Sequence, residues 1–380
     1  MIKIDFNKPF IAGKELFYIA RAVIENRHTA GNGPFTKKCD AWLEEHLCCR
    51  KALLTHSCTA ALEMAAILVD IQPGDEVIMP SFTFVSTANA FVLRGGVPVF
   101  IDICSNNLNM DVSLIEDAIT EKTRAIVPVH YAGVGCDMEK VLQIANDHGL
   151  RVIEDAAQGL LSRYQDQFLG TIGHLGCLSF HETKNIISGE GGALLINDPE
   201  LTERAEIIWE KGTNRSKFFR GQVDKYTWVD IGSSFLPGEL TAAFLFAQLE
   251  AAEKINSQRR KIFNLYLDLL RPLERDGKIR LPFVDSESFC NGHIFYILTG
   301  NFNERDRLIK YLREKGIMTV FHYVPLHSSP AGIKYGRKGG SLKVTDKMSN
   351  CVLRLPMYYE MSEEDVVTVT DELNIFFKNE

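Results

Sequence analysis

Several signals that assign a chain to a common class are missing from this sequence of 380 residues. No apolar run approaches the length that crosses a membrane, and the first residues lack the apolar core of a signal peptide. The net charge of −7 leaves no excess of basic residues, which argues against general nucleic-acid or membrane-surface binding. A small anionic substrate is still allowed, because a few local Arg or Lys side chains suffice to bind one.

Cysteines with the C-x-x-C spacing are also missing, although the sequence contains nine cysteines. None belongs to a C-x-x-C motif, and residues such as Cys104 and Cys177 lie in apolar segments. This pattern predicts reduced, packed thiols, and therefore a cytoplasmic protein without a structural metal site. There is no internal repeat and no G-x-x-x-x-G-K-[ST] motif of the kind that cradles nucleotide phosphates.

What the sequence does contain is a regular alternation of apolar and helical segments. Strands are predicted at 51–55, 76–79, 97–103, 125–129, 151–155 and 176–180. Helices are predicted from Ser57, through 88–93, from a capping box at Ser113–Glu116, and from Asp137 to Gly149. This alternation predicts an α/β fold with a mainly parallel sheet flanked by helices, in which ligands bind beyond the carboxyl ends of the strands.

The second half of the chain has a different pattern. Residues 212–238 have no clear period and are predicted to form a long functional or interface loop, followed by a long helical stretch over 239–270. We expect a large domain with an N-terminal arm over residues 1–250. A smaller C-terminal α+β domain is expected over residues 251–380.

One lysine, Lys184, stands between the apolar run at 176–180 and the glycines of 188–192. A lysine at the end of a buried strand loses part of its hydration, so its amine deprotonates more readily and can attack an aldehyde. The glycines indicate a turn or a close backbone approach. Taken alone, an exposed loop lysine explains the same pattern.

Other candidate groups lie at predicted strand ends and helix starts. The helix that opens at Ser57, Cys58 and Thr59 presents free N–H groups to a phosphate, although an ordinary helix cap explains it as well. Phe84 begins the next helix, where its ring can lie on a planar ligand or pack in the core.

Asp155 ends a buried strand, where its carboxylate requires a cation such as a protonated pyridine, unless it caps a helix. Gln158 lies three residues further on, and Lys184 follows Asp155 by 29 residues. Pyridoxal 5′-phosphate (PLP) needs a phosphate cradle, a stacking ring, a carboxylate and a lysine. This order and spacing are typical of fold-type I aminotransferases.

Five stretches resemble the DegT/DnrJ/EryC1/StrS family of sugar aminotransferases, namely 55–62, 80–89, 128–133, 154–158 and 179–185. The similarity runs nearly end to end and implies the fold-type I fold, bound PLP, and an active site shared within a homodimer. Within the family, stretches 179–185, 211–215 and 220–228 are most similar to the branch that forms dTDP-4-amino-4,6-dideoxygalactose.

The resemblance implies a role for each candidate residue. Lys184 would carry the cofactor covalently and move a proton, and Asp155 would pair with the pyridine nitrogen. Gln158 would bind the 3-oxygen of the ring, and Phe84 would stack on the ring. The phosphate would be bound by the stretch Ser57, Cys58 and Thr59, together with the Ser179 hydroxyl.

Two positions depart from the family pattern. Ser234 replaces an asparagine that usually reaches the phosphate of the partner subunit's cofactor, so this contact is in doubt or shorter. Cys58 replaces a commoner glycine and requires a negative φ. Contacts to the sugar or its diphosphate are expected at His181, His327, Arg215, Arg220 and Lys225. Packed histidines and solvated surface charges explain these last five residues equally well.

The reaction implied is the transfer of an amino group from L-glutamate, which leaves as 2-oxoglutarate, to C4 of a dTDP-4-keto-6-deoxyhexose. Amination at C3, a gluco-configured product and a UDP carrier are alternatives, because the sequence does not show which face of the sugar meets the cofactor. A different PLP enzyme and a non-enzymatic regulatory protein are further alternatives. Lys184 favours transamination over the dehydrations run by members with histidine at this position.

Overall fold

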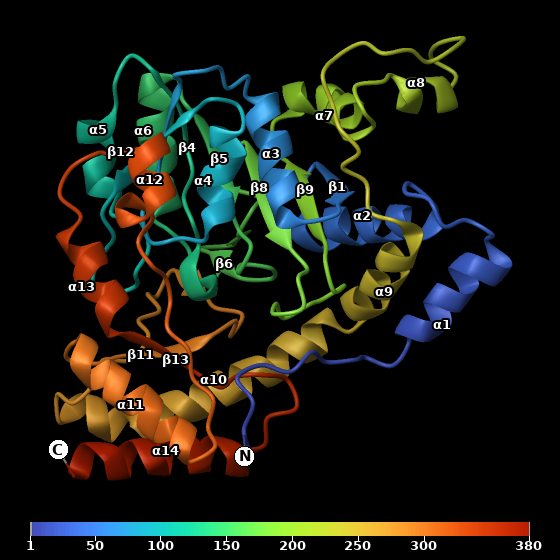
Figure 1. Ribbon diagram of the computed structural model, residues 1–380. Helices are drawn as coiled ribbons and strands as arrows, with labels where there is room; N and C mark the ends of the chain where they lie inside the picture. Colours follow the sequence, from blue (N-terminus) through green and yellow to red (C-terminus); the bar gives the residue numbers. More distant parts are fainter. Residues whose placement is uncertain (1, 380) are drawn as a thin grey trace.

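The computed structural model describes residues 2–379, and its centre is an eight-stranded sheet with the order β1-β9-β8-β5-β4-β2-β3-β12 (Figure 1). Its strands are β1 Lys51–Thr55, β2 Glu76–Pro80, β3 Val97–Ile101, β4 Thr123–Ile126, β5 Arg151–Asp155, β8 Leu175–Ser179, β9 Gly192–Ile196 and β12 Arg337–Lys338. Within this sheet, β9 runs antiparallel to β1 and β8, and the other pairings are parallel. The predicted, mainly parallel α/β sheet is therefore confirmed.

Helices cover both faces of this sheet, because successive strand residues are apolar. In β1, Leu54 packs with one face and Leu53 with the other, and Ile78 and Val77 of β2 divide in the same way. The first face is covered by α2 Pro34–Leu47, α5 Ile115–Ala118, α6 Met138–His148 and α9 Glu239–Glu250. The second face is covered by α3 Cys58–Leu68, α4 Val85–Val92 and α7 Thr202–Trp209.

Besides the clusters on the two faces of the sheet, a further apolar cluster forms around the C-terminal part of the chain. It is built from α10 Ala252–Arg275, β11 Phe295–Leu298, α11 Phe302–Glu314, β13 Val352–Leu355 and α14 Glu363–Lys378. Ile4 from the N-terminal arm joins this cluster, so the start of the described chain packs with residues of α14 (Figure 1). We propose the boundary between α9 and α10 as the domain boundary. However, α12 Pro330–Tyr335, β12 and α13 Lys343–Cys351 return to the main sheet, where β12 pairs with β3.

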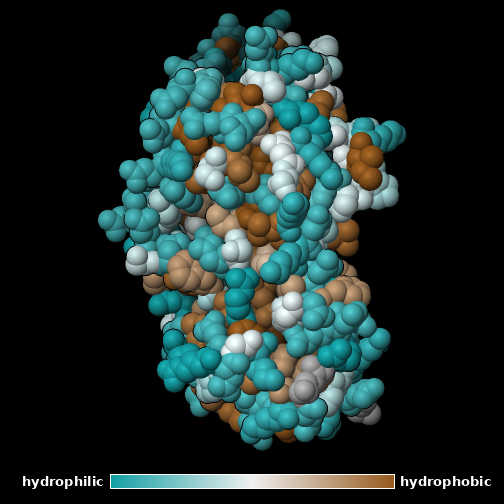
Figure 2. All heavy atoms as spheres, turned by 90° about the vertical axis from the view of Figure 1, so that its left-hand side faces the viewer, coloured by the Kyte–Doolittle hydropathy of each residue, from teal (hydrophilic) through white to brown (hydrophobic). Residues whose placement is uncertain are grey.

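The remaining elements lie at the edges of the main sheet and of the C-terminal cluster. A small sheet is formed by β6 Arg163–Tyr164, β7 Gln167–Phe168 and β10 Ser288–Phe289. Helix α1, Glu15–Ala20, continues as a π-helical turn and projects from the body on the same side as α8, Arg215–Phe219 (Figure 1). The face on the opposite side is mainly hydrophilic, with hydrophobic side chains in patches (Figure 2). Among residues 2–379, no helix combines the length and apolar character needed to span a bilayer.

Several local predictions are wrong. The helix near 113 is not opened by Ser113, because the Asp111 carboxylate accepts the Ser113 N–H at 3.1 Å and a 3₁₀ turn comes first. Segment 212–238 contains the short helix α8. The helical stretch over 239–270 bends at Ala251, which directs α10 from the main sheet to the C-terminal cluster. The strand expected over 125–129 is regular only to Ile126. The next residues keep isolated contacts with the neighbouring strands, since the Val127 N–H donates to Ile78 O and Val129 bridges Asp155.

Candidate active site

A cavity of about 620 Å³ lies beyond the carboxyl ends of β5 and β8, where the C-terminal part of the chain faces the main sheet. The structure brings nine of the predicted site residues to its wall. They are Ser57, Cys58, Thr59, Phe84, Asp155, Gln158, Ser179, His181 and Lys184. The position is the one expected for a ligand of a parallel sheet.

The start of helix α3 forms one end of the cavity. Ser57 caps the helix, since its Oγ accepts the Ala60 N–H at 3.1 Å. The N–H groups of Cys58 and Thr59 lie in the first turn and have no acceptor within the helix. Cys58 is not among the residues with positive φ, so cysteine fits here without backbone strain. Free N–H groups at the positive end of a helix suit a phosphate.

Gly192 explains part of the glycine-bearing stretch that follows Lys184. A Cβ on Gly192 would collide with the backbone of Ser57 and Cys58, so the first residue of β9 lies directly against the turn that opens α3. The loop over residues 180–191 is closed by backbone hydrogen bonds, including Ser188 N–H to Phe180 O at 2.7 Å. The glycine therefore allows a close approach of β9 to the turn that opens α3.

We expect Gly192→Ala to weaken PLP binding at least about tenfold and to lower the unfolding free energy by about 1–3 kcal/mol, because the added methyl displaces the α3 turn. The measurements are a PLP titration followed by absorbance and denaturant unfolding. Gly238→Ala is the matched control, since the Cβ there meets only one atom, at an ordinary 3.4 Å. Equal PLP affinity in both variants would contradict the close approach.

Asp155 ends β5 with its side chain at the cavity wall. One carboxylate oxygen accepts the Thr87 hydroxyl at 2.7 Å, and the other accepts the Ala157 N–H at 3.2 Å. The residue is only 6% exposed and forms no ion pair with any residue in the range 2–379. These two hydrogen bonds fix the carboxylate, and no salt bridge of the described chain occupies it, so it is available to a pyridinium nitrogen.

Gln158 and Phe84 lie beside Asp155. The Gln158 Oε1 accepts the Ala132 N–H at 2.7 Å, and its Nε2 donates to the Tyr323 hydroxyl at 3.1 Å, which leaves a second N–H for a ligand. Phe84 is 59% exposed at the start of α4 and lines the cavity. Core packing therefore does not account for Phe84, and its ring is free to cover a planar ligand.

Lys184 follows β8 and points its chain into the same cavity. Its amine makes no hydrogen bond or ion pair within the part of the chain that the structure describes. Burial lowers the pKa of the Lys184 amine; the nearby Cys58 and Asp155 oppose this effect, and the positive charge of Arg354 adds to it. An amine with a lowered pKa is more often unprotonated, and so is a better nucleophile towards an aldehyde.

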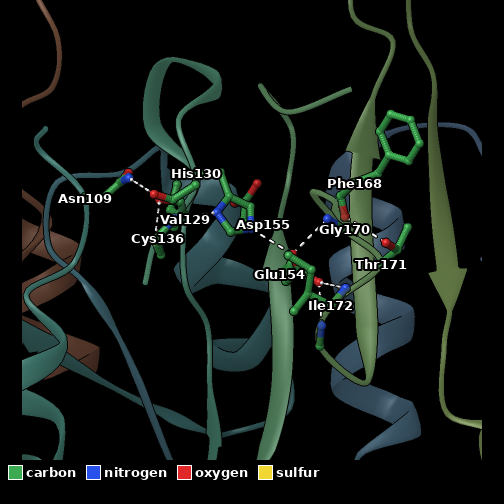
Figure 3. Close-up of polar contacts among 12 residues, drawn as sticks. Asn109, Val129, His130, Cys136, Glu154, Asp155, Phe168, Gly170, Thr171 and Ile172 are labelled. Carbon is green, nitrogen blue, oxygen red and sulfur yellow. Dashed lines mark hydrogen bonds and ion pairs between the residues drawn. The ribbon is translucent and has the colours of Figure 1, made fainter. Parts of the chain in front are cut away.

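A buried network that sequence reasoning missed holds the strand of Asp155. The fully buried Glu154 carboxylate accepts N–H groups of Gly170, Ile172 and Gly173 at 2.6–2.8 Å, and lies 2.8 Å from Nε2 of His130 (Figure 3). The Cys136 N–H donates to Nδ1 of His130, so the proton of this imidazole belongs on Nε2. The network fixes β5 just before Asp155, and the sequence shows Glu154 only as part of a strand.

The wall opposite the sheet was also missed. It is formed by residues that are distant from Lys184 in sequence and were not among the predicted site residues: Phe6, Arg259, His293, His322, Tyr323 and Arg354. These residues come from the N-terminal arm, from α10 and from the C-terminal part of the chain. Only the folded chain reveals that they face Lys184.

Five predicted residues lie outside the cavity of the single chain. His327 is buried, with Nδ1 2.8 Å from the Ser81 hydroxyl and Nε2 3.3 Å from Asp346, so it is a packed histidine here. Arg220 forms a two-pronged ion pair with Glu206, at 2.7 and 3.1 Å. The other three are exposed, namely Arg215, Lys225 and Ser234. Contacts from these residues to a substrate or a partner's cofactor stay predictions.

The fold has counterparts among solved structures. The aminotransferase TlmJ from Streptoalloteichus hindustanus superposes with a TM-score of 0.89 at 28% identity, and covers 100% of this chain and 99% of its own. The architecture is thus that of the PLP-dependent aminotransferases. The chain belongs to the DegT/DnrJ/EryC1/StrS aminotransferase family, which matches residues 11–374. It is therefore a PLP-dependent sugar aminotransferase.

Two similar sequences bear different names. GDP-perosamine synthase from Escherichia coli O157:H7 is 30% identical over 376 residues, which is 98% of either chain. A "pleiotropic regulatory protein" from Geobacillus stearothermophilus is 34% identical over 349 residues, covering 91% of this chain and 90% of that protein. The first name is that of an enzyme that makes a nucleotide sugar.

Proposed function

We propose that this enzyme transfers the amino group of L-glutamate to C4 of a dTDP-4-keto-6-deoxyhexose, giving dTDP-4-amino-4,6-dideoxygalactose. The observation that carries the proposal is one cavity lined by the Lys184 amine, which forms no hydrogen bond or ion pair within residues 2–379, by the Asp155 carboxylate and by the first turn of α3. The choice of sugar is supported by the similarity of residues 179–185, 211–215 and 220–228 to the branch with that product.

Each group of this site has a definite task. When bound, PLP supplies an aldehyde that holds the substrate amine and a ring that takes up electrons from the neighbouring C–H bond. The first-turn N–H groups of α3 and the Ser179 hydroxyl would bind the phosphate, and Asp155 would keep the pyridine nitrogen protonated. Phe84 would cover one face of the ring. Lys184 would take a proton from Cα of the donor and deliver it to C4′ of the cofactor.

A homodimer forms part of the proposal. Large apolar side chains are exposed on two segments that project from the same side of the molecule: Leu16 and Phe17 in α1, and Phe219 and Trp228 in segment 212–238 (Figure 1). A second copy would cover them. Segment 212–238 would then bring its cations towards the partner's cavity. The nine free cysteines support a reducing, cytoplasmic environment.

The alternatives to this proposal are other sugar substrates and, less strongly supported, a regulatory role without enzymatic activity. The E. coli relative is named for a GDP-linked sugar, so the nucleotide varies among similar proteins, and amination at C3, a gluco product or a UDP carrier remain alternatives. The name of the Geobacillus relative suggests a regulatory role. The complete set of Lys184, Asp155 and the α3 turn disfavours that role for this chain.

The decisive experiment is an incubation with L-glutamate and dTDP-4-keto-6-deoxyglucose, followed by NMR of the product. We expect an amino group at C4 with galacto configuration, and slower conversion of matched UDP- and GDP-linked substrates. Amination of a plain 2-oxo acid, but of no nucleotide sugar, would contradict the substrate assignment. A product with its amino group at C3 would show that the enzyme aminates C3 and would overturn the assignment of C4.

A further inference from the structure

A second cavity, of about 600 Å³, lies between α13 and the end of α10. Its volume falls within the range of cavities that hold a small molecule, about 300–1,000 Å³. Helix α13 lies on the opposite side of the molecule from α1 and α8, so the proposed homodimer would leave this cavity open (Figure 1). The charged residues of its lining are four cations and one acid, namely Lys278, Arg280, Lys343, Lys347 and Glu274.

The three lysines of this cavity have no acidic partner. Within residues 2–379, the side-chain amines of Lys278, Lys343 and Lys347 form no hydrogen bond and no ion pair. Lys343 and Lys347 are four residues apart on α13, so they lie on one face of that helix and repel each other. On the adjacent helix α11, by contrast, Lys310 pairs with Asp306 at 2.8 Å. An anion in the cavity would relieve this repulsion.

The fold fixes the position of Arg280, the fourth cation. Its backbone forms hydrogen bonds with Leu298 at 2.9 and 3.0 Å, and its Nη2 donates to the Ser105 carbonyl oxygen at 3.0 Å. These contacts use one nitrogen of the guanidinium, so other N–H donors are left for a ligand. The Glu274 carboxylate accepts the Leu281 N–H at 2.8 Å and forms no ion pair with the four cations. The lining therefore keeps an excess of positive charge.

The small sheet of β11 and β13 separates this cavity from the cavity of Lys184. Leu298 ends β11 and Cys351 precedes β13, and both line the second cavity. At the other end of the sheet, Ile294 precedes β11 and Leu355 ends β13, and both line the cavity of Lys184. No described residue lines both cavities. The second cavity is therefore a site of its own.

We propose that this second cavity binds a diphosphate with a free terminal phosphate, either as pyrophosphate or as part of a nucleotide. Four cations and one acid give the lining a net charge of +3. A diphosphate of this kind carries about three negative charges at neutral pH. Arg280 would bind it as a fork, and the lysines would act as point charges. Ile279, Leu298 and Val344 form an apolar part of the wall, which suits the base of a nucleotide.

The test compares Lys347→Gln with Lys140→Gln, which removes the same charge from an exposed position on α6 outside both cavities. Pyrophosphate and ADP are titrated by calorimetry into each PLP-loaded variant. We expect Lys347→Gln to bind pyrophosphate about 5- to 10-fold more weakly than the wild type. Lys347→Arg, which keeps the charge, should stay close to the wild type. The Lys347 amine makes no hydrogen bond within the described chain, so the variant should remain folded, as circular dichroism would show.

Equal pyrophosphate affinity in Lys347→Gln and Lys140→Gln would overturn the proposal. Arg354→Gln tests binding in the cavity of Lys184 instead. It should leave the pyrophosphate affinity unchanged, and a loss in Arg354→Gln without a loss in Lys347→Gln would also overturn the proposal. If Lys347→Gln weakens both ligands, tighter binding of ADP than of pyrophosphate to the wild type assigns the site to a nucleotide. The reverse order assigns the site to pyrophosphate itself.

Discussion

The Lys184→Ala variant is expected to lose at least about 1000-fold in kcat while remaining folded. Among the described residues, Lys184 is the only lysine that lines the cavity with Asp155. Alanine therefore removes both the covalent attachment of PLP and the group that moves the proton. The visible absorbance of PLP bound to a lysine should be absent. Steady-state turnover, an absorbance spectrum after removal of free cofactor, and circular dichroism measure these three properties.

The control for this variant is Lys140→Ala, because Lys140 is an exposed lysine on α6 that does not line the cavity. It should keep wild-type turnover and the visible band. Full turnover in Lys184→Ala would refute the role given to this lysine. If Lys184→Ala loses the visible band but keeps most of its rate, Lys184 only attaches the cofactor, and another group transfers the proton.

The second large effect is expected for Asp155→Asn, which keeps the shape of the side chain and removes its charge. An amide does not hold the pyridine nitrogen protonated, so the ring takes up electrons less readily. We expect kcat to fall about 100- to 1000-fold, with weaker PLP binding. Thr87 and Ala157 keep a hydrogen-bonding partner in the variant, so the fold should persist. Single-turnover absorbance with L-glutamate measures the chemical step directly.

Asp268→Asn is the matched control, because Asp268 has a side chain exposed by 73% on α10 and lies only 3.7 Å from Arg271 at the surface. It should behave as the wild type in both rate and cofactor affinity. If Asp155→Asn retains the wild-type single-turnover rate, the carboxylate does not serve the pyridine nitrogen. Thermal unfolding of both variants excludes a general loss of structure.

The local pattern of the sequence was sufficient for the sheet and for the groups that would hold the cofactor. Strands such as 51–55 and 151–155 are short and have apolar centres, so their type follows from nearby residues alone. Asp155, Lys184 and the start of α3 each mark a strand or helix end. In a parallel sheet such ends share one edge, which is why their meeting was predictable.

Other features depended on hydrogen bonds or packing that no local pattern shows. The residues from Ser113 to Glu116 match the capping-box motif, but the Ser113 N–H donates to the Asp111 carboxylate, and Asp111 caps a 3₁₀ turn instead. His327 appeared as a ligand candidate because histidine suits many roles. In the folded chain, Ser81 and Asp346 hold both of its ring nitrogens.

The sequence by itself determined the α/β class, the family and the half of the site that lies on the main sheet, because strand ends and helix starts are local features. Only the tertiary structure decided the opposite wall. Phe6, His322 and Arg354 come from the arm and from the C-terminal part, and their approach to Lys184 depends on how the two apolar clusters pack. Only folding could show that four separate cations share a second cavity, because proximity is a property of neighbours in space.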